Sequence, residues 1–181
     1  TKENWVKDLQ GLTLKNVGVA LFQDNKKQDS RFGEMLFTHF GLSGPIILDL
    51  SKRIEELMAT GAVFLKIDLK PALDVLTLDK RLQRDFKRNI NFKNYLPELI
   101  PKRLGDLIIK LTGISPDKKL NSINKEERKK VIYFLKCLEL TAKGSTGFGQ
   151  AIITSGGIDL KEIESKTMQS KIIKNLFFSG E

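Results

Sequence analysis

The first part of the chain alternates apolar and polar residues in the way that β-strands do. The segment 12–22 combines this alternation with β-branched residues, and the polar run 23–30 that follows predicts a turn. Two further segments, 33–39 and 62–69, have the same character, and Pro71 closes the second of them. This part of the chain is therefore predicted to consist mainly of strands.

One helix is predicted between the second and the third of these strands. Pro45 stands at its first position, where the missing N–H of proline costs nothing, and Gly61 ends it. Its apolar residues recur at helical spacing and share one face: Ile46, Ile47, Leu50, Ile54, Leu57 and Met58. Strands around a single helix indicate a small barrel or a curled sheet.

The middle of the chain changes to helical periodicity. Helices are predicted over residues 80–89 and between Pro101 and Gly113. A third follows Asn124, which forms with Glu127 the capping-box pattern of a helix start. We expect this last helix to run as far as residue 140, with Leu138 and the other apolar residues on its buried face.

The positive charge of the chain lies in this helical part. Residues 79–143 hold 17 Lys and Arg against 8 Asp and Glu, an excess equal to the net charge of +9 of the whole chain. A one-signed excess predicts affinity for anionic partners such as nucleic acid, and solvated lysines on exposed helix faces are the alternative. Phe86, Phe92 and Tyr95 are candidates for stacking on bases, although Phe86 has the spacing of a core residue.

The composition argues against several kinds of site. With one cysteine and one histidine, the chain forms neither an internal disulfide nor a zinc site of the usual kind. The apolar neighbours of Cys137 predict a buried small side chain rather than a nucleophile. No apolar run approaches the roughly 18 residues that cross a bilayer, and the single cysteine fits a reducing compartment, so we expect a cytoplasmic protein without a membrane segment.

After Gly144 the pattern becomes strand-like again. The predicted strand 150–154 leads to Gly156 and Gly157. Paired glycines at the end of a strand permit close approach of the backbone to a ligand, and a tight turn is the alternative. A polar, irregular stretch over 159–174 follows.

A last predicted strand, 176–179, runs into Gly180 and Glu181. An apolar strand followed by a small residue, a glycine and an acid is the arrangement by which many flavoproteins bring backbone and carboxylate to the flavin nucleotide. Gly180 and Glu181 are therefore candidate cofactor contacts.

Four motifs, in order along the chain, resemble the YhiN/BaiN-like family of NAD(P)/FAD-dependent oxidoreductases. The longest is the 13-residue run from Gly33 to Pro45, with the sequence GEMLFTHFGLSGP. The others lie at 151–158, 167–171 and 176–181. The chain begins without Met and stops at the acid of the last motif, so we expect it to be a middle segment of a larger flavoenzyme.

The resemblance implies an FAD-binding domain that is interrupted by a barrel and a helical insertion. The predicted fold is accordingly α+β: residues 1–78 and 144–158 form a small β-barrel subdomain, and 79–143 form an inserted basic α-helical subdomain. Residues 159–181 form a return segment, whose C-terminal strand belongs to an FAD-binding domain missing from this chain. Because the Gly-rich phosphate loop of that domain is also missing, the segment alone is expected to be inactive and not to retain FAD.

The resemblance also implies hydride transfer through FAD, with NAD(P)H as a possible donor. The cofactor-binding candidates are Gly156, Gly157, Gly180 and Glu181. His39, the only histidine, and Ser43 stand just before the Pro45 helix and are candidate catalytic residues on the substrate side of the flavin. A purely structural turn, with Ser43 as a cap, is the alternative.

Three functions are left open. In the first, the chain supplies the substrate-side wall of a flavoenzyme that acts on a small molecule. In the second, the flavoenzyme reduces a base in structured RNA, and the basic helices of 79–143 grip its phosphates. In the third, the chain is a non-catalytic interaction module.

Overall fold

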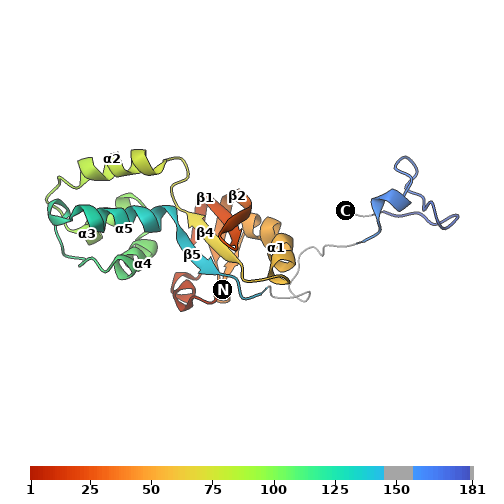
Figure 1. Cartoon of the computed structure of the whole chain (residues 1–181), viewed down its shortest axis with the longest axis horizontal. Coiled ribbons are helices and arrows are strands. Elements are labelled where there is room, and N and C mark those ends of the chain that lie inside the picture. Colours follow the sequence, from red (N-terminus) through yellow and green to blue (C-terminus); the bar gives the residue numbers. More distant parts are fainter. Residues whose placement is uncertain (145–156, 180–181) are drawn as a thin grey trace. The chain divides into compact units, whose positions relative to one another are not determined.

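The computed structural model describes residues 1–144 and 157–179, which belong to two units, Thr1–Ser145 and Thr146–Glu181. The first unit contains a five-stranded antiparallel half-barrel and a group of helices inserted into it (Figure 1). The α+β class is confirmed. The predicted strand 150–154 lies outside the described residues.

The half-barrel has the strand order β3-β2-β1-β4-β5, and every neighbouring pair is antiparallel. Its strands are β1 (Thr13–Gln23), β2 (Lys26–Phe37), β3 (Leu42–Ser43), β4 (Phe64–Asp68) and β5 (Leu138–Thr141), and the 3-10 helix η1 (Asn4–Leu9) precedes them. Helix α1 (Pro45–Met58) begins at the predicted proline and packs against β2. Leu21, Met35 and Leu50 are fully buried in the core between the sheet and this helix.

The turn between β1 and β2 is much shorter than the predicted run 23–30. It consists of Asp24 and Asn25, whose φ angles of 49° and 60° have the sign that a type I′ hairpin turn requires. Lys26 to Ser30 are polar and none of them is buried, yet they pair with β1. Without a buried face, this end of the hairpin has no hydrophobic alternation from which the strand could be predicted.

The helical group lies entirely between β4 and β5. It comprises α2 (Val75–Asp85), α3 (Phe92–Tyr95), η2 (Leu96–Glu98), α4 (Lys102–Thr112), η3 (Leu120–Ser122) and α5 (Lys125–Lys136). The capping box of α5 is confirmed: Glu127 N donates to Asn124 Oδ1 and Asn124 N donates to Glu127 Oε2, both at 2.9 Å. Helix α4 ends, as predicted, at Gly113, whose φ of 69° is left-handed.

Two predicted helices have wrong boundaries. Helix α2 spans Val75–Asp85 rather than 80–89, and it begins earlier because Asp74 caps it and accepts a hydrogen bond from Thr77 N at 2.6 Å. Helix α5 ends at Lys136 rather than at 140, and Leu138 is buried on strand β5. In so short a stretch, helical and alternating patterns both fit the apolar residues, and hydrogen bonding to β4 decides between them.

The aromatic residues proposed to stack on bases are instead part of the core, so that prediction is wrong. Phe86, Phe92 and Tyr95 have exposed fractions of 6%, 0% and 0%. The ring of Phe86 meets that of Tyr95 edge to face at 5.7 Å, and the Tyr95 hydroxyl donates to Asp85 at 2.8 Å. Burial raises the pKa of Tyr95. The helical group therefore has an apolar core of its own.

The described part of the second unit, residues 157–179, contains a 3-10 turn, η5 (Leu160–Glu162), and two isolated bridges, Ile163 with Ser170 and Gln169 with Phe177. The predicted strand 176–179 is present only as the second bridge. No residue of 157–179 is buried. A strand needs neighbouring strands for its hydrogen bonds, and this stretch does not supply them.

Across the described residues, no helix combines the length and the apolar character that crossing a bilayer requires.

Gly44, at the start of α1, provides a test of how tightly the predicted motif is packed. Its φ is +95°, and a Cβ there would lie 3.0 Å from Leu36 N and Met35 Cα. Gly11 has a similar φ of +81° but open space around it. Alanine in the left-handed region is unfavourable at both positions. Because Gly44→Ala adds a steric contact, it should lower the free energy of unfolding by about 1–3 kcal/mol more than Gly11→Ala does. Urea denaturation measures both losses. Equal losses would show that the contact relaxes without cost.

Candidate nucleic-acid interface

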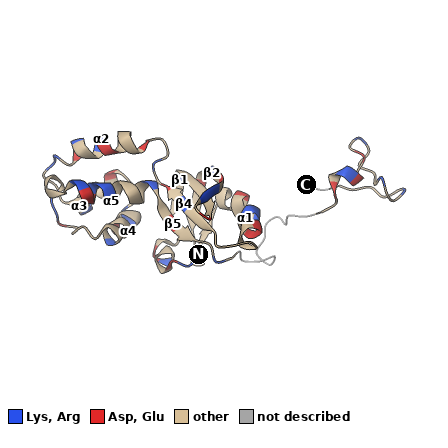
Figure 2. Ribbon diagram, viewed as in Figure 1, with Lys and Arg blue, Asp and Glu red and all other residues tan. Residues whose placement is uncertain are grey.

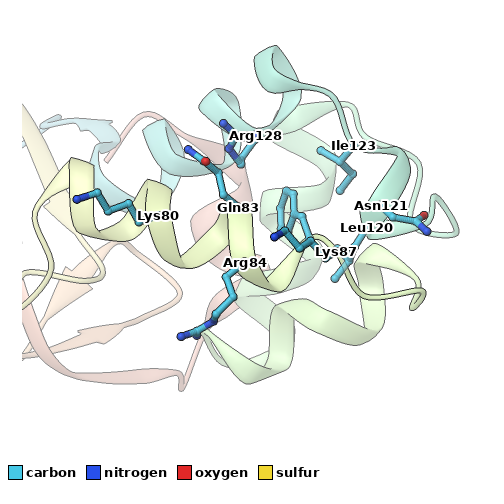
Figure 3. Close-up of a pocket in the computed structure, with 9 residues that line it drawn as sticks. Lys80, Gln83, Arg84, Lys87, Leu120, Asn121, Ile123 and Arg128 are labelled. Atoms are coloured by element: carbon cyan, nitrogen blue, oxygen red, sulfur yellow. The ribbon is translucent and has the colours of Figure 1, made fainter.

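An open groove of about 750 Å³ lies between α2 on one side and η3 with α5 on the other (Figure 3). Helix α2 and the turn after it contribute five of the residues that line the groove, and the rest come from η3, the residue after it, and α5. They are Lys80, Gln83, Arg84, Phe86, Lys87, Leu120, Asn121, Ile123 and Arg128. Four of the nine are cationic and none is acidic.

The groove wall follows from the amphipathic pattern of α2. Leu78, Leu82 and Phe86 are spaced four residues apart and are buried. The lining residues Lys80, Gln83, Arg84 and Lys87 follow i, i+3, i+4, i+7 spacing, which places them along another side of the same helix and its C-terminal turn. The positive charge of this region is evident in the sequence, whereas the stripe along the groove is evident only in the structure.

The opposite wall comes from residues that the sequence did not mark. The turn η3 has only three residues, Leu120–Ser122, too few for a periodic pattern. Leu120 is fully buried and anchors the turn, while Asn121 beside it is exposed.

Lys and Arg recur along both α2 and α5, with fewer acidic residues between them (Figure 2).

One carboxylate next to the groove is already neutralised. Asp79 Oδ1 accepts from Arg128 Nε at 2.8 Å, and Asp79 Oδ2 accepts from Gln83 Nε2 at 2.5 Å. The hydrogen bond from Arg128 is the main cause that lowers the pKa of Asp79. The Asp79–Arg128 ion pair therefore joins α2 to α5.

The other cations of the groove are less constrained. Arg84 Nε lies 3.0 Å from Asp85 Oδ1, and the Arg84 side chain is 75% exposed. Lys80 and Lys87 are exposed, and within residues 1–144 and 157–179 neither makes an ion pair. An anionic ligand would meet these two ammonium groups without displacing a protein carboxylate.

The two candidate catalytic residues lie elsewhere, in the connection from β2 through β3 to α1. His39 is exposed and its ring stacks edge to face on Phe40, with the centroids 4.9 Å apart. Ser43 is half-buried in β3, where it pairs with Leu36. Figure 1 shows α1 and the helical group on different sides of the sheet. Neither His39 nor Ser43 is among the residues that line the groove.

Of the four cofactor-binding candidates, the structure describes only Gly157. Its φ of +118° favours glycine, it is exposed, and a Cβ there would contact nothing within 4 Å. Gly156, Gly180 and Glu181 lie outside the described residues. Flavin contact at all four positions stays a prediction.

The chain is similar to a known protein family over most of its length. Residues 1–153 match the family model described as "HI0933-like protein barrel and H2TH domain". The chain is 35% identical over 152 residues to the ribosomal RNA dihydrouridine synthase of Haemophilus influenzae, covering 84% of the chain and 36% of the relative. For the ribosomal RNA dihydrouridine synthase of Escherichia coli the identity is 34% over 147 residues, with 81% and 35% covered.

A more distant relative acts on a different kind of molecule. The 3-dehydro-bile acid delta(4,6)-reductase of Clostridium scindens is 22% identical over 152 residues, which cover 82% of the chain and 37% of the relative. The chain spans about a third of the length of these curated relatives.

The Asp79–Arg128 pair should make the stability of the helical group depend on acid pH. Because the pKa of Asp79 is lower in the folded protein, its stabilising contribution is complete above about pH 4 and is lost as the pH falls through the folded-state pKa. When the pH is lowered from 6 to 3, the free energy of unfolding should therefore fall less for Asp79→Asn than for the wild type. Urea denaturation at several pH values measures this. Asp106→Asn, which removes an exposed carboxylate on α4, is the control. Parallel profiles for wild type and Asp79→Asn would contradict the assignment.

Proposed function

This chain belongs to the HI0933-like (YhiN/BaiN) family, and on that basis we propose that it is the substrate-binding part of an FAD-dependent oxidoreductase that reduces a base in structured RNA. The observation that carries the proposal is the location of the positive charge. The whole net charge of +9 lies in residues 79–143, and the groove of that region is lined by four cations and no acid. The names of the two relatives that are about a third identical agree with an RNA substrate.

The proposal divides the work between this chain and an FAD-binding domain. The flavin, when bound, supplies the hydride chemistry, with NAD(P)H as the proposed electron donor. The helical group holds the RNA by its phosphates. The connection that carries His39 and Ser43 forms the substrate-side wall, and Gly156, Gly157, Gly180 and Glu181 are the proposed flavin contacts.

The described residues of the second unit fit a role in packing against such a domain. Leu160, Ile172 and Phe177 have exposed fractions of 82%, 68% and 59%. Several large apolar side chains exposed within one short segment are typical of a surface that binds a partner. We propose that residues 159–181 pack against the FAD-binding domain, which would bury these side chains.

A small-molecule substrate is the second candidate, and the bile acid reductase favours it. That relative is only 22% identical. A neutral small molecule gains nothing from an excess of nine positive charges over residues 79–143, and an anionic one with a single charge needs only a small part of it. All three relatives are named as enzymes, which argues against the non-catalytic module.

The proposal predicts that the chain binds RNA in a salt-dependent manner. Cations that neutralise phosphates release counterions, so the affinity for ribosomal or transfer RNA should fall steeply as salt rises from about 50 to 200 mM. Fluorescence anisotropy with labelled RNA at several salt concentrations measures this slope. A chain that binds no RNA even at the lowest salt would contradict the RNA substrate and favour the small molecule.

A second prediction concerns His39 in a flavoenzyme that carries this segment together with its FAD-binding domain. Because His39 is exposed, His39→Ala should leave the melting temperature unchanged. If the histidine exchanges a proton with the substrate, turnover should fall about a hundredfold. Lys26→Ala, in the exposed hairpin at the start of β2, is the control. Turnover of His39→Ala equal to that of the control would remove His39 from the site.

A further inference from the structure

We infer that the groove between α2 and η3 binds RNA through its phosphates alone and leaves the identity of the bases unread. The inference rests on the proposed function, because it takes RNA as the ligand. It adds the part of the RNA that this surface recognises and the part that it does not.

Lys80 and Lys87, which make no ion pair in the part of the chain that the structure describes, are suited to phosphate. Lys80 and Lys87 are seven residues apart, which corresponds to roughly 10 Å along a helix axis, so they face different points of a backbone that follows the groove. An ammonium group is a point charge with donors in several directions, and it binds a phosphate whatever base the nucleotide carries.

Arg84 adds donors to the same stripe. Its ion pair with Asp85 uses Nε, and a guanidinium has five N–H groups, so its terminal nitrogens stay available. Asp85 also accepts from the Tyr95 hydroxyl, which holds this carboxylate beside the helix. Arg128, in contrast, has a side chain that is only 15% exposed and is committed to Asp79. Arg128 is therefore part of the groove wall and is not expected to contact a phosphate.

The groove lining offers no exposed ring on which a base could stack. Stacking requires an exposed ring, and the one aromatic residue of the lining, Phe86, is 6% exposed. Leu120 and Ile123 beside it are also buried, at 0% and 8%. The exposed aromatic ring of α5, Tyr133, is not part of the lining.

The polar groups that recognise base edges are nearly all occupied. Carboxylates and free amides make specific hydrogen bonds to bases. The contact of Arg or Lys with guanine is made in the major groove, which in a paired RNA stem is too deep and narrow for side chains to read. Asp79 is shared between Arg128 and Gln83, which also commits the amide nitrogen of Gln83. Asn121 is the remaining amide, and its oxygen accepts from Ser122 Oγ at 3.4 Å. On a paired stem, Asn121 is therefore the residue of the groove lining through which base reading would act.

The test measures binding of the 181-residue chain to an RNA hairpin and to a second hairpin of the same shape with a permuted sequence. The wild type should bind both with equal affinity. In Lys80→Gln/Lys87→Gln, the slope of log affinity against log salt should shrink by about two units for both hairpins. The matched control, Lys26→Gln/Lys27→Gln, removes the same charge from the exposed β1–β2 hairpin and should keep the wild-type slope.

Two single variants complete the test. Asp79→Asn removes a negative charge beside the groove and releases Arg128, so it should bind both hairpins more tightly, whereas a cation stripe with no ligand would show no gain. Asn121→Ala should leave the ratio of the two affinities unchanged. Circular dichroism melting confirms that each variant is folded.

Distinct outcomes separate the two levels of the proposal. If the wild type binds RNA but the lysine pair and its control lose the same amount of slope, the groove is not the site. If the wild type prefers one hairpin and Asn121→Ala abolishes that preference, the groove reads bases and the inference is wrong. If the wild type binds neither hairpin at low salt, the proposed RNA function itself fails.

Discussion

The pairing of β4 with β5 is the constraint on which the rest of the first unit depends. It joins residues 64–67 to 138–141, and so closes the whole helical group into one long connection between two neighbouring strands. The backbone N–H of Leu69 donates to Leu135 O at 2.9 Å just beyond this pairing. Lys136 Nζ lies 2.5 Å from Asp68 Oδ2 and also donates to the carbonyl oxygens of Lys70 and Leu73. Both ends of the insertion are thus held at one point.

A second attachment keeps the helical group from turning about that point. The guanidinium of Arg103, near the start of α4, donates to the carbonyl oxygens of Asp8 and Gln10 beside η1. Two separate attachments define an orientation, because a single one leaves a rotation free. The orientation of the groove relative to the sheet therefore follows from the β4–β5 pairing together with the contacts of Lys136 and Arg103.

Much of this architecture was predictable from local pattern. The strand-then-helix order, the Pro45 start of α1, the Asn124–Glu127 capping box and the Gly113 end of α4 all rest on short-range chemistry that a few neighbouring residues contain. Strand β5 was not predictable, because four residues with two buried leucines fit a helix as well as a strand. Phe86, Phe92 and Tyr95 were misassigned since aromatic residues among lysines suit both a core and a base-binding surface, and only burial distinguishes the two.

The sequence by itself determined that the positive charge is concentrated between residues 79 and 143, that this stretch is helical, and that the chain carries the motifs of its family. These properties are local or additive, so neighbouring residues suffice to establish them. The tertiary structure decided which charges face solvent without a partner. Asp79 and Arg128, 49 positions apart, neutralise each other across two helices, while Lys80 and Lys87 on the same stripe make no ion pair within the described residues. Coulomb interactions depend on distance in space, and the order of residues along the chain does not contain that distance.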